Sequence, residues 1–177
     1  GRTMGVNPLS HFISSYPDFP KPGILFRDIS PVLASPEAMD LLVAQFEEKL
    51  APFKPDLFAG IESRGFLFST LMARTFNTGS LMIRKPGKLP GKLIQRSYAL
   101  EYGENTLAIQ ANAPVEGKRV IIIDDLLATG GTIRAAASLL TERGAHPVAT
   151  GVVVELTGLK GRDTLPTEVI SLVSYDD

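Results

Sequence analysis

The sequence predicts an α/β fold: an open, mostly parallel twisted sheet with helices on both faces. Apolar runs of strand length alternate along the chain with segments of helical spacing, as is typical of parallel sheets. The run Val120 to Ile123 is wholly β-branched, as in strands that are buried on both faces. With 177 residues, 44% of them hydrophobic, the chain can bury the core of one domain. We therefore expect a single domain over residues 1–177, in which Gly1 to Thr3 resemble a cloning remnant.

The elements of this fold can be placed in order along the chain. Residues 17–31 are rich in proline and are expected to form an ordered loop with one short extended piece. Ser35 is the expected N-cap of a helix that continues to Leu50 with one apolar stripe. The remaining pattern predicts strands over 56–61, 80–83, 106–112, 120–124 and 148–154, and helices over 66–76 and 133–143. In such a sheet, ligands bind beyond the carboxyl ends of the strands.

The segment 120–132, which reads VIIIDDLLATGGT, carries most of the functional information in the chain. Small residues follow the predicted strand, and missing Cβ atoms allow several backbone N–H groups to converge on one anion. The helix that begins at the next residues would turn its positive end toward the same anion. We therefore expect a phosphate site formed by Ala128, Thr129, Gly130, Gly131 and Thr132.

Two aspartates, Asp124 and Asp125, stand at the end of that strand, just before the small residues. Neighbouring side chains on an extended strand face opposite ways, which argues against a pair of carboxylates that share one proton. Two acids in this position are better suited to accept hydrogen bonds from two vicinal hydroxyl groups, or to assist a divalent cation.

Two further segments are expected near the same edge of the sheet. Glu62 to Gly65 is a tight connection between a buried strand and an apolar helix. The connection from Arg84 to Gly103 holds five basic residues and no acid before Glu101. A long basic loop that leaves the carboxyl end of a strand predicts a flexible lid, over residues 84–105, that closes on a polyanion. The alternative is a solvated basic hairpin.

Composition and motifs exclude several classes of function. Cysteine is absent, which excludes disulfides and thiolate metal sites, and two histidines argue against a structural zinc site. We expect both, His11 and His146, on the surface. The small-residue turn lacks the lysine of a nucleotide P-loop. A net charge of −1 gives no general attraction to nucleic acid or membrane, and we see no membrane span or signal peptide. We therefore expect a cytoplasmic protein.

The segment 120–132 closely resembles the phosphoribosyl pyrophosphate motif of type I phosphoribosyltransferases. Five other segments resemble the adenine branch of that family: FPKPGILFRDISPVL at 19–33, GIESRGFLF at 60–68, RKPGKLPG at 84–91, LEYG at 100–103 and VVELTGLKGR at 153–162. The resemblance spans nearly the whole chain. It implies the type I phosphoribosyltransferase fold with an N-terminal hood that binds the base and a lid loop. The implied reaction converts adenine and phosphoribosyl pyrophosphate to AMP and pyrophosphate in a homodimer.

The resemblance also implies roles for residues at the phosphate end of the substrate. It assigns the 5′-phosphate to residues 128–132 and the ribose hydroxyls to Asp124 and Asp125. It assigns pyrophosphate to Glu62, Ser63 and Arg64, with Arg64 also catalytic, and further charge from Arg84, Lys85 and Lys88, some of it reaching across a dimer interface. Mg²⁺ is implied as the cofactor, carried mainly by the substrate's own oxygens and water, so no residue is assigned as a direct metal ligand.

Other residues are implied to hold and protonate the base. Adenine would contact the main chain near Leu25 and Arg27, with its ring between Phe26 and Leu156. From composition alone, these residues would be read as ordinary core and surface positions. Glu101 matches the acid that acts on the N7 side of adenine, and Tyr102 would help to close the lid. Arg134 stays open, as a solvent-facing helix residue or as an extra phosphate contact.

Two alternative functions remain at this stage. The acceptor could be another purine base, since oxopurine enzymes commonly use a lysine in the region after Val153, and Lys160 lies nearby within the adenine-type pattern. The chain could also be a non-catalytic sensor of phosphoribosyl pyrophosphate on the same fold. Such repressors generally add a basic DNA-binding domain, for which this sequence has no room.

Overall fold

The computed structural model describes residues 6–99 and 103–177. The chain forms two compact units, Gly1–Gln45 and Phe46–Asp177. The expectation of a single domain stays a prediction, and the proposed remnant at Gly1 to Thr3 lies outside the described residues.

The first unit contains a two-stranded hairpin. Strand β1 (Ser14–Pro17) pairs antiparallel with β2 (Leu25–Asp28), between η1 (Pro8–Phe12) and the short helix α1 (Ser30–Leu33). Within residues 17–31, β2 is the one short extended piece that was expected. Strand β1 lies ahead of that range except for Pro17 and was not predicted, because its four mostly polar residues give no strand pattern. The pairing is supported instead across the hairpin, where Arg27 Nη1 donates to Ser15 Oγ at 2.7 Å.

Helix α2 (Pro36–Leu50) begins in the first unit and ends in the second. The Ser35 hydroxyl accepts a hydrogen bond from the Ala38 amide at 3.2 Å, which confirms the predicted N-cap.

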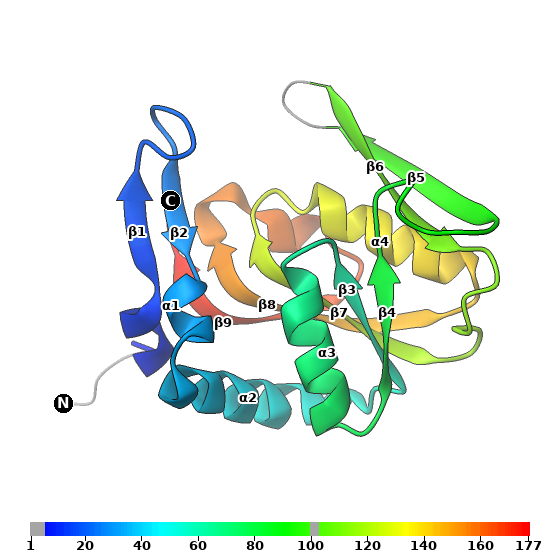
Figure 1. Ribbon diagram of the computed structural model, residues 1–177, viewed down its shortest axis with the longest axis horizontal. Coiled ribbons are helices and arrows are strands. Elements are labelled where there is room, and N and C mark those ends of the chain that lie inside the picture. Colours follow the sequence, from blue (N-terminus) through cyan, green and yellow to red (C-terminus); the bar gives the residue numbers. More distant parts are fainter. Residues whose placement is uncertain (1–5, 100–102) are drawn as a thin grey trace. The chain divides into compact units, whose positions relative to one another are not determined.

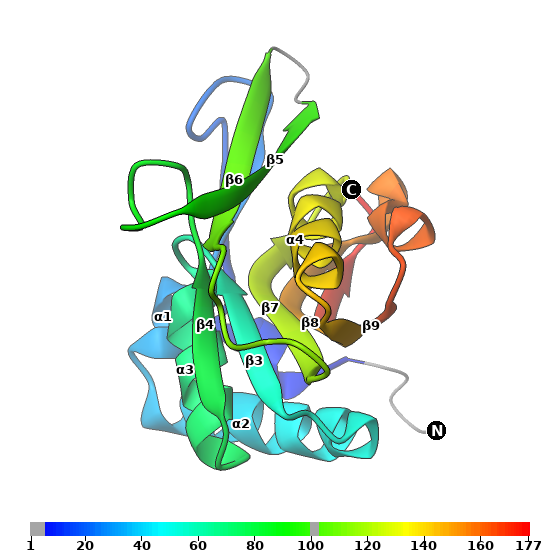
Figure 2. The same cartoon turned by 90° about the vertical axis from the view of Figure 1, so that its right-hand side faces the viewer.

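The second unit is built on a five-stranded sheet whose neighbouring strands are all parallel. Its strands, in spatial order, are β4 (Gly79–Ile83), β3 (Leu57–Ile61), β7 (Arg119–Leu127), β8 (His146–Leu156) and β9 (Glu168–Tyr175). Helix α3 (Gly65–Thr75) covers one face and α4 (Gly131–Glu142) the other (Figures 1 and 2). The predicted parallel sheet with helices on both faces is confirmed. The short helices η2 (Ala51–Phe53), η3 (Thr157–Leu159) and η4 (Gly161–Thr164) lie in connections.

The core explains why β7 is so apolar. All four residues of the run Val120 to Ile123 are fully buried. Val120 and Ile122 join the cluster that contains the buried side chains of α4. Ile123 faces the other side, where Gly151 leaves room for it: a Cβ on Gly151 would lie 2.9 Å from Ile123 Cδ1 and 3.2 Å from the Phe46 ring. The strand is therefore packed on both faces, as its sequence predicts.

One predicted strand belongs to a different sheet. The segment expected at 106–112 overlaps β6 (Glu104–Gln110), which pairs antiparallel with β5 (Leu93–Ala99) in a separate two-stranded sheet. Because β5 lies within the predicted lid loop, that region is not all loop, and the alternative of a hairpin describes its backbone. The hairpin extends beyond the carboxyl ends of the main strands (Figure 2). Its register depends on cross-strand pairing, which a local pattern does not reveal.

Strand β9 is absent from the predicted set. It lies at the edge of the sheet, and only four of its eight residues are apolar aliphatic, so it lacks the apolar run of a central strand. Both histidines are exposed, as expected. None of the described helices has the length and apolar character needed to cross a membrane.

Candidate active site

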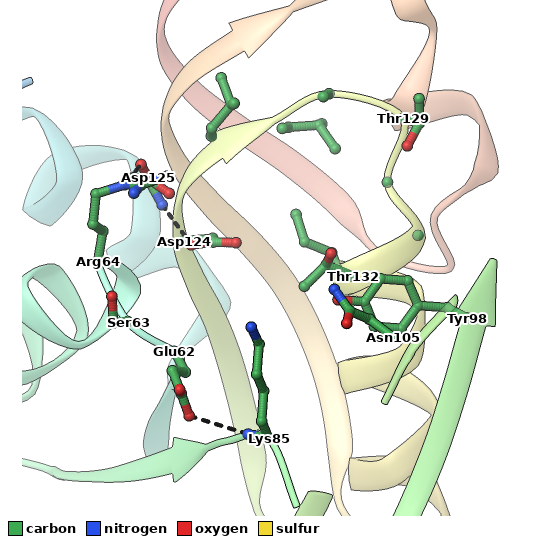
Figure 3. A pocket seen from close by; sticks show the side chains of 16 residues that line it. Glu62, Ser63, Arg64, Lys85, Tyr98, Asn105, Asp124, Asp125, Thr129 and Thr132 are labelled. Atoms are coloured by element: carbon green, nitrogen blue, oxygen red, sulfur yellow. Dashed lines mark hydrogen bonds and ion pairs between the residues drawn. The ribbon is translucent and has the colours of Figure 1, made fainter. Parts of the chain in front are cut away.

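A pocket of about 410 Å³ lies where the carboxyl ends of β3 and β7 meet the start of α4 (Figure 3). Parallel strands bring their carboxyl ends to one edge, so segments far apart in the sequence meet there. The lining residues are Glu62, Ser63, Arg64, Lys85, Tyr98, Asn105, Asp124, Asp125, Leu126, Leu127, Ala128, Thr129, Gly130, Gly131, Thr132 and Ile133. The pocket thus brings together the two loops that the sequence predicted to share this edge.

One wall of the pocket is the turn of residues 128–132, called the phosphate turn below. Gly130 is the N-cap of α4, and its φ of +94° is a left-handed conformation that favours glycine. No side chain caps this helix end. The first N–H groups of a helix have no partner within the helix, and here they open next to the pocket. The turn can therefore accept an anion, and the helix dipole adds to the attraction.

The two aspartates at the end of β7 point to opposite sides, as strand geometry predicts. Asp124 points into the pocket toward the phosphate turn, whereas Asp125 turns toward Arg64 (Figure 3). Arg64 Nε donates to Asp125 Oδ2 at 2.5 Å, and the Asp125 amide donates to Asp124 Oδ1 at 2.9 Å. Asp125 is 9% exposed, and this arginine is its ion-pair partner.

The electrostatics of the two aspartates differ. Burial raises the pKa of the Asp124 carboxyl well above its ordinary value, and the neighbouring charge of Asp125 raises it further. The hydrogen bond and charge of Asp125 in turn raise the pKa of Arg64. The pocket therefore holds one carboxyl that resists ionisation, Asp124, beside one carboxylate that is paired with an arginine, Asp125. An incoming cation or a set of hydroxyl donors would stabilise the charged form of Asp124.

The opposite wall is the loop after β3, in which the Glu62–Ser63 peptide bond is cis. Burial acts to raise the pKa of Glu62, but the pKa is lowered overall by hydrogen bonds from the Lys85 amide (3.1 Å) and Arg84 Nε (3.0 Å) and by the charge of Lys88. Gly65 then starts α3 directly against β7, since a Cβ there would lie 2.7 Å from the Ile123 carbonyl oxygen. The loop and β7 are thus in backbone contact.

The three basic residues assigned to pyrophosphate, Arg84, Lys85 and Lys88, lie in different surroundings in the structure. Lys85 lines the pocket, and its ammonium group points into it (Figure 3). Arg84 instead pairs with Glu62, and its guanidinium lies 5.5 Å from the centre of the Phe66 ring. Lys88 is exposed, and neither it nor Arg84 is among the lining residues. Of these three cations, the structure therefore brings Lys85 into the pocket.

Sequence reasoning missed two polar residues that line the pocket, Tyr98 and Asn105. They face each other across the β5–β6 hairpin, and the Tyr98 ring lies 3.3 Å from where a Cβ of Gly131 would be. One signal was present: Ile94, Arg96 and Tyr98 alternate with more exposed residues, as on the inner face of a strand. The hairpin therefore supplies part of the site.

Comparison with known proteins identifies the family. A family model described as the phosphoribosyl transferase domain matches residues 32–174. A curated adenine phosphoribosyltransferase from Rhodospirillum rubrum is 49% identical over 168 residues, which cover 95% of this chain and 98% of that protein. The chain belongs to the adenine phosphoribosyltransferase family. The resemblance stated from the sequence motifs is thereby confirmed.

Solved structures of the same family support the fold. An adenine phosphoribosyltransferase from Thermoanaerobacter pseudethanolicus superposes with a TM-score of 0.91 at 43% identity, covering 94% of this chain and 98% of that one. The enzyme from Saccharomyces cerevisiae, solved with an imino-altritol bisphosphate and adenine, gives a TM-score of 0.87 at 39% identity, covering 93% of this chain and 96% of that one. The predicted phosphoribosyltransferase fold is therefore confirmed.

The remaining family assignments fall into two groups. Leu25, Phe26 and Arg27 lie on β2 in the first unit, where the Phe26 ring contacts the Phe19 ring edge-on at 5.1 Å, and Leu156 ends β8 in the second unit. Their roles in adenine binding stay predictions. Glu101 and Tyr102 lie outside the described residues.

Arg134 is exposed but not isolated. Its Nη1 donates to Thr164 Oγ1 at 2.6 Å and approaches the Thr129 carbonyl at 3.4 Å, while the side chain is not among those that line the pocket. It contacts the phosphate turn from outside. Over residues 6–99 and 103–177, no three His, Cys, Asp or Glu side chains gather as a metal-holding group.

The Arg64–Asp125 pair gives a testable prediction for this family member. Arg64→Met should weaken the binding of pyrophosphate about tenfold, because one of the cations facing the pocket is lost. It should also lower the thermal midpoint, because Asp125 is left as a buried carboxylate without its partner. Calorimetric binding and thermal unfolding measure both effects. Arg74→Met is a matched control, since Arg74 is exposed in the last turn of α3, the helix that begins directly after Arg64. Unchanged pyrophosphate binding would remove Arg64 from the site.

Proposed function

We propose that this protein transfers the 5-phosphoribosyl group from phosphoribosyl pyrophosphate to adenine, giving AMP and pyrophosphate. One observation carries the proposal: the Asp124 carboxylate and the phosphate turn face each other across one pocket, in a chain 49% identical to an adenine phosphoribosyltransferase over nearly its full length. A carboxylate next to a helix N-terminus can hold a sugar through its hydroxyl groups and its phosphate at the same time.

Each end of the substrate has a matching part of the pocket. In this proposal the phosphate turn binds the 5′-phosphate, and Asp124 and Asp125 accept hydrogen bonds from the ribose hydroxyls. Arg64, Lys85 and the amides of the Glu62 loop bind pyrophosphate. When pyrophosphate leaves, negative charge grows on the leaving group beside Arg64 and Lys85. An oxocarbenium-like ribose remains between the pyrophosphate and the two aspartates. Fixed cations and carboxylates that are already in position stabilise this separation of charge.

The base is proposed to lie between Phe26 and Leu156, with main-chain contacts near Leu25 and Arg27. Glu101 is proposed to donate to the N7 side of adenine while N9 attacks the ribose carbon, and Tyr102 is proposed to help close the lid of residues 84–105. These roles rest on the match between the family motifs and the sequence. A closed site would also keep water from the reactive ribose.

Magnesium, the homodimer and the cytoplasm belong to the proposal as well. Mg²⁺ dehydrates reluctantly and is commonly held by substrate phosphates with one or two carboxylates. Asp124, whose carboxyl points into the pocket, fits this arrangement with the substrate's diphosphate. When bound, the ion would neutralise charge on the pyrophosphate.

A panel of bases tests the proposed reaction. The purified protein is incubated with phosphoribosyl pyrophosphate, Mg²⁺ and one of adenine, hypoxanthine, guanine or orotate, and nucleotide and pyrophosphate are quantified. We expect AMP and pyrophosphate in equal amounts from adenine alone. Formation of IMP or GMP at a similar rate would favour a different purine acceptor. Binding of phosphoribosyl pyrophosphate without any nucleotide product would favour a sensor.

The proposed acid can be tested separately. Glu101→Gln should lower kcat about a hundredfold while KM changes little, because the amide cannot supply the proton in the transition state. Glu104→Gln is the matched control, since Glu104 is an exposed glutamate at the start of β6. Steady-state kinetics of both variants decide the question. A rise in KM with unchanged kcat would make Glu101 a binding residue only.

A further inference from the structure

The phosphate turn is supported from behind by a second segment, η4. A Cβ on Gly161, the first residue of η4, would lie 2.2 Å from the Ala128 carbonyl oxygen and 3.0 Å from Leu127 Cδ1. At the other end of η4, Thr164 Oγ1 lies 3.0 Å from where a Cβ of Gly130 would be. No residue of η4 is among those that line the pocket. The backbone of η4 therefore touches the backbone of the turn on the side away from the pocket.

An ion pair between an exposed arginine and a buried carboxylate fixes η4 in place. Glu155, near the end of β8, is 3% exposed. Arg162 of η4 donates to both of its carboxylate oxygens, from Nε at 3.0 Å and from Nη2 at 2.7 Å, and Ser171 of β9 donates to it at 2.9 Å. The hydrogen bonds from Arg162 hold the pKa of Glu155 below its ordinary value despite burial. A two-point pair of this kind fixes orientation as well as distance.

The pair also lies close to the turn along the sheet. Glu155 is opposite Leu127 of β7, the residue directly before the phosphate turn. A second connection runs from the other side, where Thr164 Oγ1 accepts from Arg134 Nη1 at 2.6 Å and donates to the Gly161 carbonyl at 2.7 Å. The turn is thus enclosed between its own helix and a segment that Arg162 ties to the central sheet.

We propose that Arg162 is a positioning residue for the 5′-phosphate site: by holding η4 against Glu155, it keeps the phosphate turn in the shape that directs its amides at the anion. The proposal rests on the proposed function for the identity of the ligand. Arg162 itself does not touch the substrate. Its loss should therefore act on the phosphate end of the substrate and leave the pyrophosphate end nearly unchanged, whereas a general loss of stability would weaken both.

The test compares two fragments of the substrate in Arg162→Met and Arg162→Lys. Equilibrium binding of ribose 5-phosphate and of pyrophosphate is measured by calorimetry, together with KM for phosphoribosyl pyrophosphate. For Arg162→Met we expect ribose 5-phosphate binding to weaken about tenfold and KM to rise similarly, because small displacements of positioning groups are costly. Pyrophosphate binding should stay within about twofold of the parent protein. Arg162→Lys should fall between, since lysine keeps the charge but not the two-point geometry.

Arg119→Met provides the matched control. Arg119 stands at the opposite end of β7 and also donates from two nitrogens, Nε at 3.0 Å and Nη2 at 2.7 Å, to the Phe53 carbonyl. It should lower the thermal midpoint without changing the binding of either fragment. If Arg162→Met does not fold, Arg162→Lys decides the question.

The positioning role would be overturned if the folded variants bound ribose 5-phosphate as tightly as the parent protein does. It would also be overturned if their affinities for ribose 5-phosphate and for pyrophosphate fell by the same factor. The two fragments bind without turnover, so this result is separate from the base panel. A parent protein that binds ribose 5-phosphate but makes no AMP would contradict the proposed function and leave the role of Arg162 standing.

Discussion

Asp124→Asn is expected to stabilise the ligand-free protein and to lower its activity at least about a hundredfold. The carboxyl points into the pocket, and burial together with the charge of Asp125 raises its pKa well above the ordinary value of 3.8. Ionised Asp124 is therefore a cost to the folded state at neutral pH. The variant removes the ionisable group but keeps an oxygen that can accept the hydrogen bond from the Asp125 amide. Activity falls because the sugar loses a charged acceptor.

The pH dependence follows from the same shift. Between 3.8 and its raised folded pKa, Asp124 binds more protons in the folded than in the unfolded state. The stability that protonation provides is present at low pH and is lost as pH rises through the folded pKa. Asparagine does not titrate, so the variant should lack this loss. At pH 7 its thermal midpoint should exceed that of the parent protein, by roughly 2 to 4 °C for each kcal/mol gained in the free energy of unfolding. The difference between the two midpoints should shrink toward pH 4.

Thermal unfolding at several pH values and kcat/KM measure the two halves of this prediction. Asp40→Asn is the matched control, because Asp40 is exposed on α2. It should change neither the midpoint nor the turnover. A variant at Asp124 that is less stable than the parent protein at pH 7 would show that its charge is already compensated in the ligand-free state.

The second large effect is expected at Gly65. Gly65→Ala should destabilise the fold by about 1 to 3 kcal/mol, the usual range for overpacking a tight contact. It should also lower kcat/KM roughly a hundredfold, because displaced catalytic groups lose their alignment. A Cβ at this position would lie 2.7 Å from the Ile123 carbonyl oxygen and 3.2 Å from Asp124 Oδ1. Neither neighbour can yield easily, since one is backbone of the central strand and the other faces the pocket. The start of α3 and the loop that carries Arg64 would have to move away.

Gly79→Ala is the matched control for this change. Gly79 is an exposed residue of the edge strand β4, and the nearest atom to an added Cβ is a Leu57 methyl carbon at 3.4 Å, an ordinary contact. Chemical denaturation and steady-state kinetics compare the two variants. Alanine is intrinsically a better helix former than glycine, so a gain in stability at Gly65 would contradict the close contact between α3 and β7.

The sequence predicted best those features that are encoded in consecutive residues. The run from Val120 and the small residues after it predicted β7, the phosphate turn and α4 within a few residues of their observed bounds. The strand expected at 56–61 and the helix expected at 66–76 are likewise shifted by only a residue. Buried apolar runs and glycine turns have local causes, so a local pattern is enough to find them.

The features that were missed depend on pairing between distant segments. The hairpin register that brings Tyr98 and Asn105 to the pocket and the pairing of β9 at the sheet edge arise from contacts across the chain. The contact between Gly161 and the phosphate turn also joins segments that are distant in the sequence. Arg84 pairs with Glu62, and the sequence alone does not show whether its guanidinium pairs with this carboxylate or points into the pocket. The assigned roles of the site residues stay predictions until the variants are measured.

The contact between Arg64 and Asp125 has a thermodynamic consequence for how the two halves of the substrate arrive. Each group already satisfies the other at rest, so an anion that draws Arg64 away releases the aspartate oxygen for a sugar hydroxyl, and the reverse is equally true. Filling one half therefore makes filling the other easier, by the same factor in both directions. Ribose 5-phosphate and pyrophosphate should bind cooperatively when offered together, and a molecule that unites them disrupts the resting contact only once.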